Sequence, residues 1–217
     1  MLKTFQKKMV IKQKKYYKSL KVNCDNEGIA KASQIIEQGG IVVFPTDTVY
    51  GIGCNPYNKE SAKKVYEIKS RDFSKPFPVL VYSKEIAKQI AEFDEISEKL
   101  AEKFWPGQLT ILLKLKDMKL KESLNITDKI ALRVPNHKCT LQILEKCKYL
   151  VGTSANVSGQ SSFFDPQECI KNVENYDVFV DGGTITSKGE STIVEIEDGK
   201  VKIIREGSLS KEEIWNS

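Results

Sequence analysis

The stretch at residues 39–82 constrains the fold most, because a buried strand, a polar loop and an amphipathic helix follow one another there. Residues 41–44 are a short apolar run after two glycines, as expected of a buried strand. Pro45 ends the run, because proline cannot donate to a β-ladder. A polar loop at residues 46–51 follows, and the apolar spacing at residues 60–69 predicts a helix. The stretch therefore predicts a strand, a loop, a helix, a basic loop and a second strand.

Two cations close the predicted helix. We expect Lys69 and Arg71 to lie on one side of a short extended segment, because side chains alternate along extended backbone. A lysine point charge beside a planar arginine fork suits a polyphosphate ligand. Taken alone, the pair is better explained as the solvated basic end of a helix, where cations are favoured in any case.

Strands and helices alternate along the rest of the chain. Helix caps are expected at Asp25 or Asn26, at Ser83 and at Asp94, each before a run with helical apolar spacing. An Asp-Gly pair at 198–199 between two alternating runs predicts a β-hairpin. Further strands are expected at residues 22–26, 109–115, 129–134, 149–152 and 178–181. The 217 residues show no break in composition, which predicts one α/β domain without a linker.

The net charge of +5 comes mainly from the beginning of the chain. Eight lysines lie within the first 21 residues, and no acidic residue precedes Asp25. We interpret residues 1–20 as a basic, flexible extension and residues 21–217 as the folded domain, which is close to neutral. The charge mildly favours an anionic partner such as a nucleotide or RNA. A transit peptide is the alternative, but such leaders are usually rich in arginine and serine.

Five cysteines and one histidine restrict the chemistry. The cysteine number is odd and no C-x-x-C pair occurs, so we expect reduced thiols in a cytoplasmic protein, not a disulfide framework. The single histidine, His137, argues against a histidine-rich metal site and is the only candidate for a histidine base. No run approaches the roughly 20 apolar residues of a membrane span, and no signal-peptide core is present.

Polar loops at strand ends are the remaining candidates for a site. The chain has no G-x-x-x-x-G-K-[ST], no G-x-G-x-x-G after a strand and no G-x-S-x-G. Ligand crevices in open α/β sheets form outside strand ends, so these loops are able to converge. Their hydroxyls, amides and cations would together suit a ligand with phosphates and a carboxylate, although each alone is explained by turn capping or a structural ion pair. The loops are residues 46–50, 69–71, 133–137, 154–156, 191–192 and Arg205.

At these residues the sequence resembles the YrdC-like family, the threonylcarbamoyl-AMP synthases. The resemblance covers about residues 25–212 and gains its specificity from the order of the motifs. The matches are FPTDTVYGIG at 44–53, K-x-R at 69–71, KP at 75–76, WPGQLT at 105–110, ALRVPNH at 131–137, SANVSG at 154–159, DGG at 181–183, STIV at 191–194 and REG at 205–207. The resemblance implies a single α/β domain with a twisted mixed β-sheet flanked by helices. Since the chain ends at Ser217, we expect the short family form without an additional C-terminal domain.

The resemblance also implies an activity. Members of the family join L-threonine, bicarbonate and ATP into threonylcarbamoyl-AMP and pyrophosphate, and the product serves the t6A modification of tRNA. We therefore expect a nucleotidyltransferase whose downstream partners are tRNA threonylcarbamoyl-transferase proteins, with weak contact to tRNA or other RNA and none to a membrane. A substrate carbamate attacks the α-phosphate in this chemistry, which agrees with the scarcity of protein nucleophiles.

The nucleotide side of the site is assigned by the matching motifs. Lys69, Arg71, Ser154 and Asn156 correspond to the family's K-x-R/S-x-N tetrad around the phosphates, and Arg205 also faces the nucleotide. These four are the expected catalytic residues. Mg²⁺ is expected with the ATP, held by its phosphates more than by a dedicated protein site.

The threonine side is assigned in the same way. We expect Arg133 to clamp the threonine carboxylate with its planar fork, and Val49 or Tyr50 to supply an apolar wall for the methyl group. The expected threonine-binding residues are Thr46, Thr48, Tyr82, Arg133 and Ser191.

Three positions depart from the family pattern. Many members have histidine at Tyr82, which leaves the contacts with threonine open, and Asn-Pro or a small residue at Phe77. Gln108 replaces a frequent proline.

Two other functions stay open: an RNA-binding module that uses the lysine-rich extension, and a paralogue that transfers carbamoyl groups to another acceptor. The near-neutral domain and the lack of an RNA-recognition motif count against the first, and the intact tetrad counts against the second.

Overall fold

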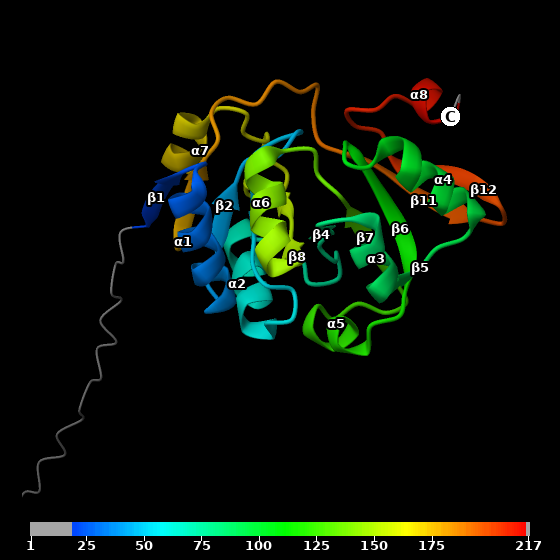
Figure 1. Ribbon diagram of the computed structural model, residues 1–217, viewed down its shortest axis with the longest axis horizontal. Coiled ribbons are helices and arrows are strands. Elements are labelled where there is room, and N and C mark those ends of the chain that lie inside the picture. The colour runs from blue at the N-terminus through cyan, green and yellow to red at the C-terminus, as the bar shows by residue number, and fades with distance from the viewer. Residues whose placement is uncertain (1–18, 216–217) are drawn as a thin grey trace, which may run out of the picture.

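The computed structural model describes residues 19–215 (Figure 1). Most of the predicted basic extension, residues 1–18, therefore lies outside the described residues. The first strand, β1 (Leu20–Asn23), begins at the last position of that predicted extension. The amide of Leu20 donates to the carbonyl of Asp177 at 2.9 Å, so the last residue of the predicted extension pairs with the domain.

Five strands form the first sheet, in the order β1-β10-β2-β3-β9. The pairs β1–β10 and β10–β2 are parallel, and the pairs β2–β3 and β3–β9 are antiparallel. The strands of this sheet beyond β1 are β2 (Val42–Phe44), β3 (Gly51–Gly53), β9 (Thr153–Ser154) and β10 (Val178–Asp181).

The remaining strands form a second sheet, in the order β12-β11-β6-β7-β4-β8, with β5 paired to β6. It is also mixed, since β11–β6 and β4–β7 are parallel and the other pairs are antiparallel. The predicted mixed α/β fold is confirmed, with its strands divided between two sheets. The strands of the second sheet are β4 (Val79–Val81), β5 (Ala91–Glu92), β6 (Leu109–Leu115), β7 (Lys129–Arg133), β8 (Tyr149–Val151), β11 (Thr192–Glu197) and β12 (Lys200–Arg205).

The two sheets meet backbone to backbone. The amide of Val151 in β8 donates to the carbonyl of Cys54, just after β3, at 2.9 Å. A Cβ on Gly53 would lie 1.6 Å from the carbonyl oxygen of Val151, so only glycine allows this approach. The chain then passes from the second sheet to the first through Gly152, between β8 and β9.

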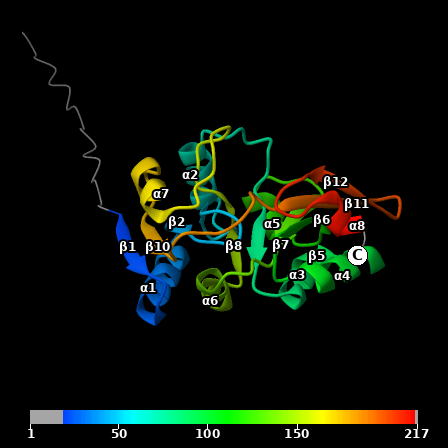
Figure 2. The same cartoon turned by 90° about the horizontal axis from the view of Figure 1, so that it is seen from above.

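Both faces of the central strand β2 are buried. Val42 and Phe44 pack in a cluster with α1 (Asn26–Glu37) and α6 (Lys138–Cys147), which lie side by side in Figures 1 and 2. Val43 packs on the opposite face, in the main core. This two-sided burial explains why the strand reads as an unbroken apolar run.

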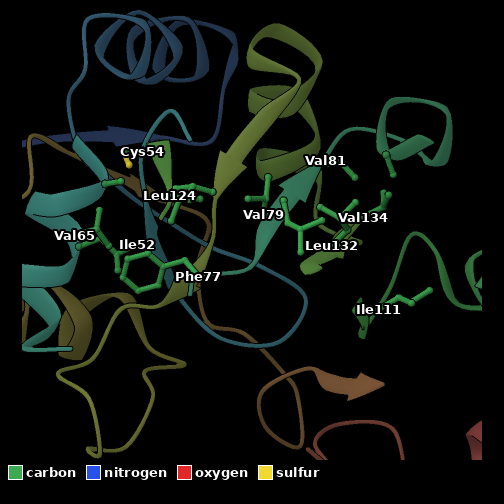
Figure 3. Close-up of a cluster of buried hydrophobic side chains, with 14 of the residues drawn as sticks. Ile52, Cys54, Val65, Phe77, Val79, Val81, Ile111, Leu124, Leu132 and Val134 are labelled. Carbon is green, nitrogen blue, oxygen red and sulfur yellow. The ribbon is translucent and has the colours of Figure 1, made fainter. Parts of the chain in front are cut away.

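The main core continues from the first sheet into the second (Figure 3). Val65 of α2 (Lys59–Lys69) and Ile52 of β3 lie next to Phe77 in this view, and Val79, Leu132 and Ile111 extend the same cluster through the second sheet. A single apolar cluster therefore joins the two sheets, and the loops that carry polar side chains are held by both.

The helices begin where the caps were expected. Asp25 accepts from Gly28 N at 2.8 Å, Ser83 caps α3, and Asp94 forms a capping box with Ser97. None of the helices in the described range is long and apolar enough to cross a membrane. The helices not yet given are α3 (Lys84–Ile90), α4 (Glu95–Phe104), α5 (Met118–Ser123), α7 (Pro166–Asn172) and α8 (Lys211–Trp215).

The predicted hairpin is confirmed. Strands β11 and β12 pair antiparallel, and Asp198 and Gly199 between them have φ values of 50° and 69°. Two successive residues in the left-handed region are what a tight hairpin turn requires, and Asp-Gly tolerates this better than most pairs.

One expectation about the cysteines is wrong. Cys24 and Cys139 form a disulfide, with a Cα–Cα distance of 5.5 Å and a sequence separation of 115 residues. It joins the residue before the cap of α1 to the first turn of α6. Cys54, Cys147 and Cys169 are free thiols, as expected. So distant a pair leaves no spacing pattern in the sequence, which explains why the disulfide was not expected. Because the disulfide is present, the cysteine count no longer supports a reducing compartment.

Candidate active-site cleft

A cleft of about 780 Å³ is lined by strands and loops of both sheets. Its walls include Phe44 of β2 and Ser154 of β9 from the first sheet, and Leu80, Leu112 and Ile193 from the second. Nine of the ten predicted site residues line this cleft, although they come from segments far apart in the chain. These nine are Thr46, Thr48, Lys69, Arg71, Arg133, Ser154, Asn156, Ser191 and Arg205.

Lys69 is the last residue of α2 and is only 2% exposed. Its ammonium donates to the backbone carbonyls of Ser154 and Asn156, the latter at 2.7 Å. A third, longer contact of 3.4 Å reaches Asn156 Oδ1. Burial and the nearby charge of Arg71 lower the pKa of Lys69 to about 8. Lys69 thus fastens the 154–156 turn to the end of α2, and its third N–H is the one that can turn to a ligand.

The expected extended segment at Lys69 and Arg71 is wrong. Lys69 is helical, and Ser70 takes a left-handed conformation with φ 48° and ψ 43°. This turn still brings both cations into the cleft. The Arg71 guanidinium donates from Nε to Lys75 O at 2.8 Å and lies 5.2 Å from the ring centroid of Phe77. Phe77, one of the departures from the family pattern, is buried, and its ring stabilises the Arg71 guanidinium through a cation–π contact.

Arg205 lies at the end of β12 and is held by Glu190 and Ser191, which directly precede β11. Its Nη1 forms an ion pair with the carboxylate of Glu190. Its Nη2 donates to Ser191 O at 2.8 Å and lies 3.3 Å from Ser191 Oγ. The Ser191 hydroxyl also shares a hydrogen bond of 2.8 Å with Thr110. Arg205 therefore connects the phosphate-binding candidates with Ser191.

Arg133, at the end of β7, already holds a carboxylate of the protein. Its Nη2 pairs with Asp47 Oδ1 at 2.5 Å, its Nη1 donates to Thr48 Oγ1 at 3.0 Å, and its Nε donates to Gly107 O at 2.8 Å. Burial lowers the pKa of Arg133, and the charge of Asp47 opposes that shift. Three of the five N–H groups are used in this way, which leaves two for a carboxylate ligand.

The two threonine hydroxyls of the loop after β2 are also partly used. Thr46 Oγ1 donates to Val49 O at 2.7 Å and accepts from the amides of Thr48 and Val49. Thr48 Oγ1 lies 2.9 Å from Thr46 Oγ1 and must be the donor there, because the hydroxyl proton of Thr46 is already donated to the carbonyl of Val49. Thr46 therefore shapes the loop, and Thr48 carries the contact with Arg133.

Tyr82 is the predicted residue that the structure does not bring to the cleft. Its side chain is 39% exposed, it follows β4, and it does not belong to the cleft lining. Tyr50 is buried and also turns away: its hydroxyl donates to Gly183 O at 2.8 Å and accepts from Gly182 N at 3.2 Å. Val49, in contrast, lines the cleft. Of the two residues expected to form an apolar wall, Val49 therefore lines the cleft and Tyr50 fixes the turn at 182–183.

His137 does not contribute to the cleft lining. It precedes α6, burial lowers its pKa, and its Nδ1 is buried without a hydrogen-bond partner in the described structure. Gln108, at the position where proline is frequent, donates from Nε2 to Asp47 O at 2.7 Å. A proline has no side-chain donor for this contact, so the substitution steadies the loop that pairs with Arg133.

Three residues of the site were not singled out from the sequence. Asp47 and Thr110 lie within the matched motifs, and their polar side chains next to strand ends were the available signal. Glu190 directly precedes Ser191, pairs with Arg205 and interacts with the charge of Lys69. A lone carboxylate beside a predicted site residue is too common a pattern to be identified without the fold.

No group of three or more His, Cys, Asp or Glu side chains within residues 19–215 is arranged to hold a metal ion. The donors of the cleft are mainly N–H and O–H groups, from arginines, a lysine and hydroxyls. Such a donor set is suited to binding and positioning anions, with their charge stabilised by fixed dipoles and cations.

Comparisons with known proteins identify the family of this chain. The family model Sua5_yciO_yrdC, described as "Telomere recombination", matches residues 34–207. A putative threonylcarbamoyl-AMP synthase of Methanocaldococcus jannaschii is 37% identical over 80% of this chain and 83% of its own length. The threonylcarbamoyl-AMP synthase of Pyrococcus abyssi is 32% identical over 84% of this chain.

The structural comparison points the same way. The crystal structure of P. abyssi Sua5 complexed with L-threonine superposes with a TM-score of 0.80 at 30% identity, over 91% of this chain and 59% of that one. The chain spans about 55% of the length of the P. abyssi synthase. The match at residues 34–207 covers most of the chain, and the M. jannaschii relative is matched over most of its own length. The chain therefore belongs to the Sua5/YciO/YrdC family.

Proposed function

We propose that this chain is a threonylcarbamoyl-AMP synthase, which condenses L-threonine, bicarbonate and ATP into threonylcarbamoyl-AMP and pyrophosphate. The observation that carries the proposal is the convergence of nine matched residues in one cleft. The relatives that carry this name, and the Sua5 structure with L-threonine, support the same reaction.

The threonine would lie beside the loop after β2. The two remaining N–H groups of Arg133 suit its carboxylate, and the hydroxyls of Thr48 and Ser191 suit its amine and hydroxyl groups. Val49 offers an apolar contact for the methyl group. The phosphates of ATP would lie against Arg71, Arg205 and the third N–H of Lys69.

In the proposed reaction the threonine nitrogen bonds to the carbon of bicarbonate, and hydroxide leaves with a proton as water. A carbamate oxygen then bonds to the α-phosphorus while the α–β bridging oxygen leaves with pyrophosphate. No step needs a protein nucleophile. The chain supplies positioning and charge stabilisation: Lys69 holds the 154–156 turn, and Arg71 and Arg205 bind the charge that develops on the phosphates.

Mg²⁺ is part of the proposal as a companion of the nucleotide. The anion-binding donor set of the cleft fits a metal carried by the phosphates better than one held by the protein alone. When bound there, Mg²⁺ would neutralise phosphate charge. We further propose a cytoplasmic location, tRNA threonylcarbamoyl-transferase proteins as receivers of the product, and weak contact with tRNA.

The test is pyrophosphate release from ATP and bicarbonate, with and without L-threonine, and with L-serine as a matched amino acid. Release that depends on threonine is the expected result. Release without any amino acid would indicate a carbamoyl-transferring paralogue. No release, together with RNA binding that weakens steeply with salt, would indicate an RNA-binding module instead.

A further inference from the structure

Glu190 places a carboxylate among the cations of the cleft. Its Oε2 pairs with Nη1 of Arg205, and its Oε1 accepts from Ser162 Oγ at 2.6 Å. It also interacts with the Ser154 side chain and with the charge of Lys69. The side chain is 32% exposed, so it is partly sheltered from solvent. Three groups expected to bind phosphate thus already face a protein anion.

The carboxylate is ionised in this setting. Burial raises the pKa of Glu190, but the Ser162 hydrogen bond and the charge of Arg205 outweigh burial, and the pKa lies below its ordinary value. Among the described residues, the other carboxylate in the cleft lining is Asp72. It accepts from Ser74 N at 2.8 Å, in its own loop. Glu190 is therefore distinct in facing the cation cluster.

A phosphate group would need the same donors. Carboxylate and phosphate oxygens both accept from arginine in paired, charge-assisted hydrogen bonds. A phosphate on Arg205 must therefore displace Glu190 or lie against it, and two anions at this distance repel each other. Pyrophosphate, the proposed product, has no base or ribose with which to offset that repulsion.

We propose that Glu190 is an internal competitor for the phosphate-binding donors, which returns to Arg205 as pyrophosphate leaves and so promotes product release. This role rests on the proposed function, because the competing ligand is the product of that reaction. Glu190 acts on the ligand through Arg205 and Ser154, so it is a positioning residue. Its effect is to weaken the binding of pyrophosphate more than a neutral residue of the same shape would.

The experiment compares wild type with Glu190→Gln by calorimetric titration of pyrophosphate at pH 7, without Mg²⁺, threonine or bicarbonate. Glutamine keeps the size of the side chain and one acceptor oxygen for Arg205 or Ser162, and it replaces the negative charge and the second acceptor with a neutral NH2 group. We expect pyrophosphate to bind about tenfold tighter, which corresponds to about 1.4 kcal/mol. In turnover, pyrophosphate should inhibit the variant at about tenfold lower concentration.

Glu197→Gln is the matched control. Glu197 is an exposed residue at the end of β11, pairs with Lys202 at 2.9 Å and does not line the cleft. The Glu197→Gln substitution removes the same charge from the molecule, and we expect no change in its affinity for pyrophosphate. Glu190→Asp is a second variant, since it keeps the charge but retracts the carboxylate; a smaller tightening is expected there.

The outcomes separate the two proposals. Tighter binding by Glu190→Gln, with Glu197→Gln unchanged, supports the role of Glu190. Equal or weaker binding by Glu190→Gln overturns it and leaves the proposed synthase activity standing. ATP is titrated in parallel, and if wild type and Glu190→Gln both fail to bind pyrophosphate and ATP, the phosphate site itself is wrong and both proposals fall.

Discussion

Lys69 and Arg71 carry the same charge but are held in different ways. Lys69 is buried, and its ammonium satisfies the carbonyls of Ser154 and Asn156. Arg71 lies on a more exposed loop, where its guanidinium contacts Lys75 O and the ring of Phe77. Two neighbouring cations of one motif therefore contribute to the fold to different degrees.

Lys69→Ala and Arg71→Ala should both abolish threonine-dependent pyrophosphate release, but only the first should clearly weaken the fold. Removal of the ammonium leaves two carbonyls without their donor, at a cost of about 1–3 kcal/mol. Arg71→Ala should cost less than about 1 kcal/mol, because its partners can turn to water. Urea denaturation measures both, with the exposed Lys202→Ala as control. Equal stability of the two variants would contradict the assigned role of Lys69.

The pKa of Lys69, about 8, predicts a pH dependence of ligand binding. As the pH rises through about 8, Lys69 loses its proton, and the affinity for pyrophosphate should fall by up to about tenfold per pH unit. Calorimetric titrations between pH 7 and pH 9.5 measure this fall. Lys69→Arg keeps its charge in that range and should bind without the step. A step of the same size in this variant would mean that another group titrates.

The titration of Lys69 changes the stability of the fold in the opposite direction from its effect on ligand binding. The folded-state pKa of Lys69 is lowered from 10.5, its ordinary value, to about 8. Between these two values the unfolded chain binds more protons than the folded chain, so the contribution of Lys69 to the free energy of unfolding rises with pH there. Below about pH 8 both states are protonated, and this contribution no longer changes.

At the scale of elements, the disulfide joins two neighbouring helices. Cys24 precedes the cap of α1, Cys139 lies in the first turn of α6, and the two helices share one apolar cluster with β2. In the same turn of α6, the hydroxyl of Thr140 donates to the carbonyl of Pro45, at the start of the Thr46–Thr48 loop. The disulfide therefore supports a helix that borders the proposed threonine site.

Reduction of the Cys24–Cys139 disulfide should lower the stability of the fold. A disulfide typically contributes about 2–4 kcal/mol, or about 4–16 °C in melting temperature for a chain of this size. Thermal unfolding with and without reductant measures the change. The double variant Cys24→Ser/Cys139→Ser, which keeps the three free thiols, should not respond to reductant. An unchanged melting temperature of the reduced wild type would show that the bond contributes nothing.

At the scale of the whole molecule, charge is distributed unevenly. Seven lysines and no acidic residue lie in residues 1–18, outside the part of the chain that the structure describes. In the cleft, in contrast, Lys69, Arg133 and Arg205 are paired with carbonyls or carboxylates. Binding of nucleotide at the cleft and binding of RNA by general charge attraction are therefore expected to depend on different parts of the chain.

Deletion of residues 1–18 should leave threonine-dependent pyrophosphate release within about twofold of wild type, because the residues of the cleft all lie in the retained part. RNA binding at low salt should weaken, since lysines supply the counterion-release term. Turnover assays and filter binding with tRNA at two salt concentrations measure both effects. Loss of turnover on deletion would show that these residues belong to the catalytic unit.

The sequence predicted elements well where a local signal exists. The caps at Asp25, Ser83 and Asp94, the hairpin at Asp198-Gly199 and the helix that ends at Lys69 depend on nearby residues alone. The short strands β3 and β9 were expected to be loops, because two or three residues carry no measurable periodicity. The pairing of β9 with β3 joins residues more than 100 positions apart, and β3 also pairs with the nearby β2.

The ordered motifs determined the family and most of the site, because each short segment keeps its own chemistry wherever the fold places it. Only the tertiary structure decided how those side chains are used. It placed Tyr82 outside the cleft, gave Arg133 the partner Asp47, paired Cys24 with Cys139 and set Glu190 against Arg205. Three of these outcomes are contacts between residues that are separated along the chain, and the fourth is the direction in which one side chain leaves the end of a strand. Such contacts arise from packing in three dimensions, which leaves no periodicity or regular spacing in the amino-acid sequence.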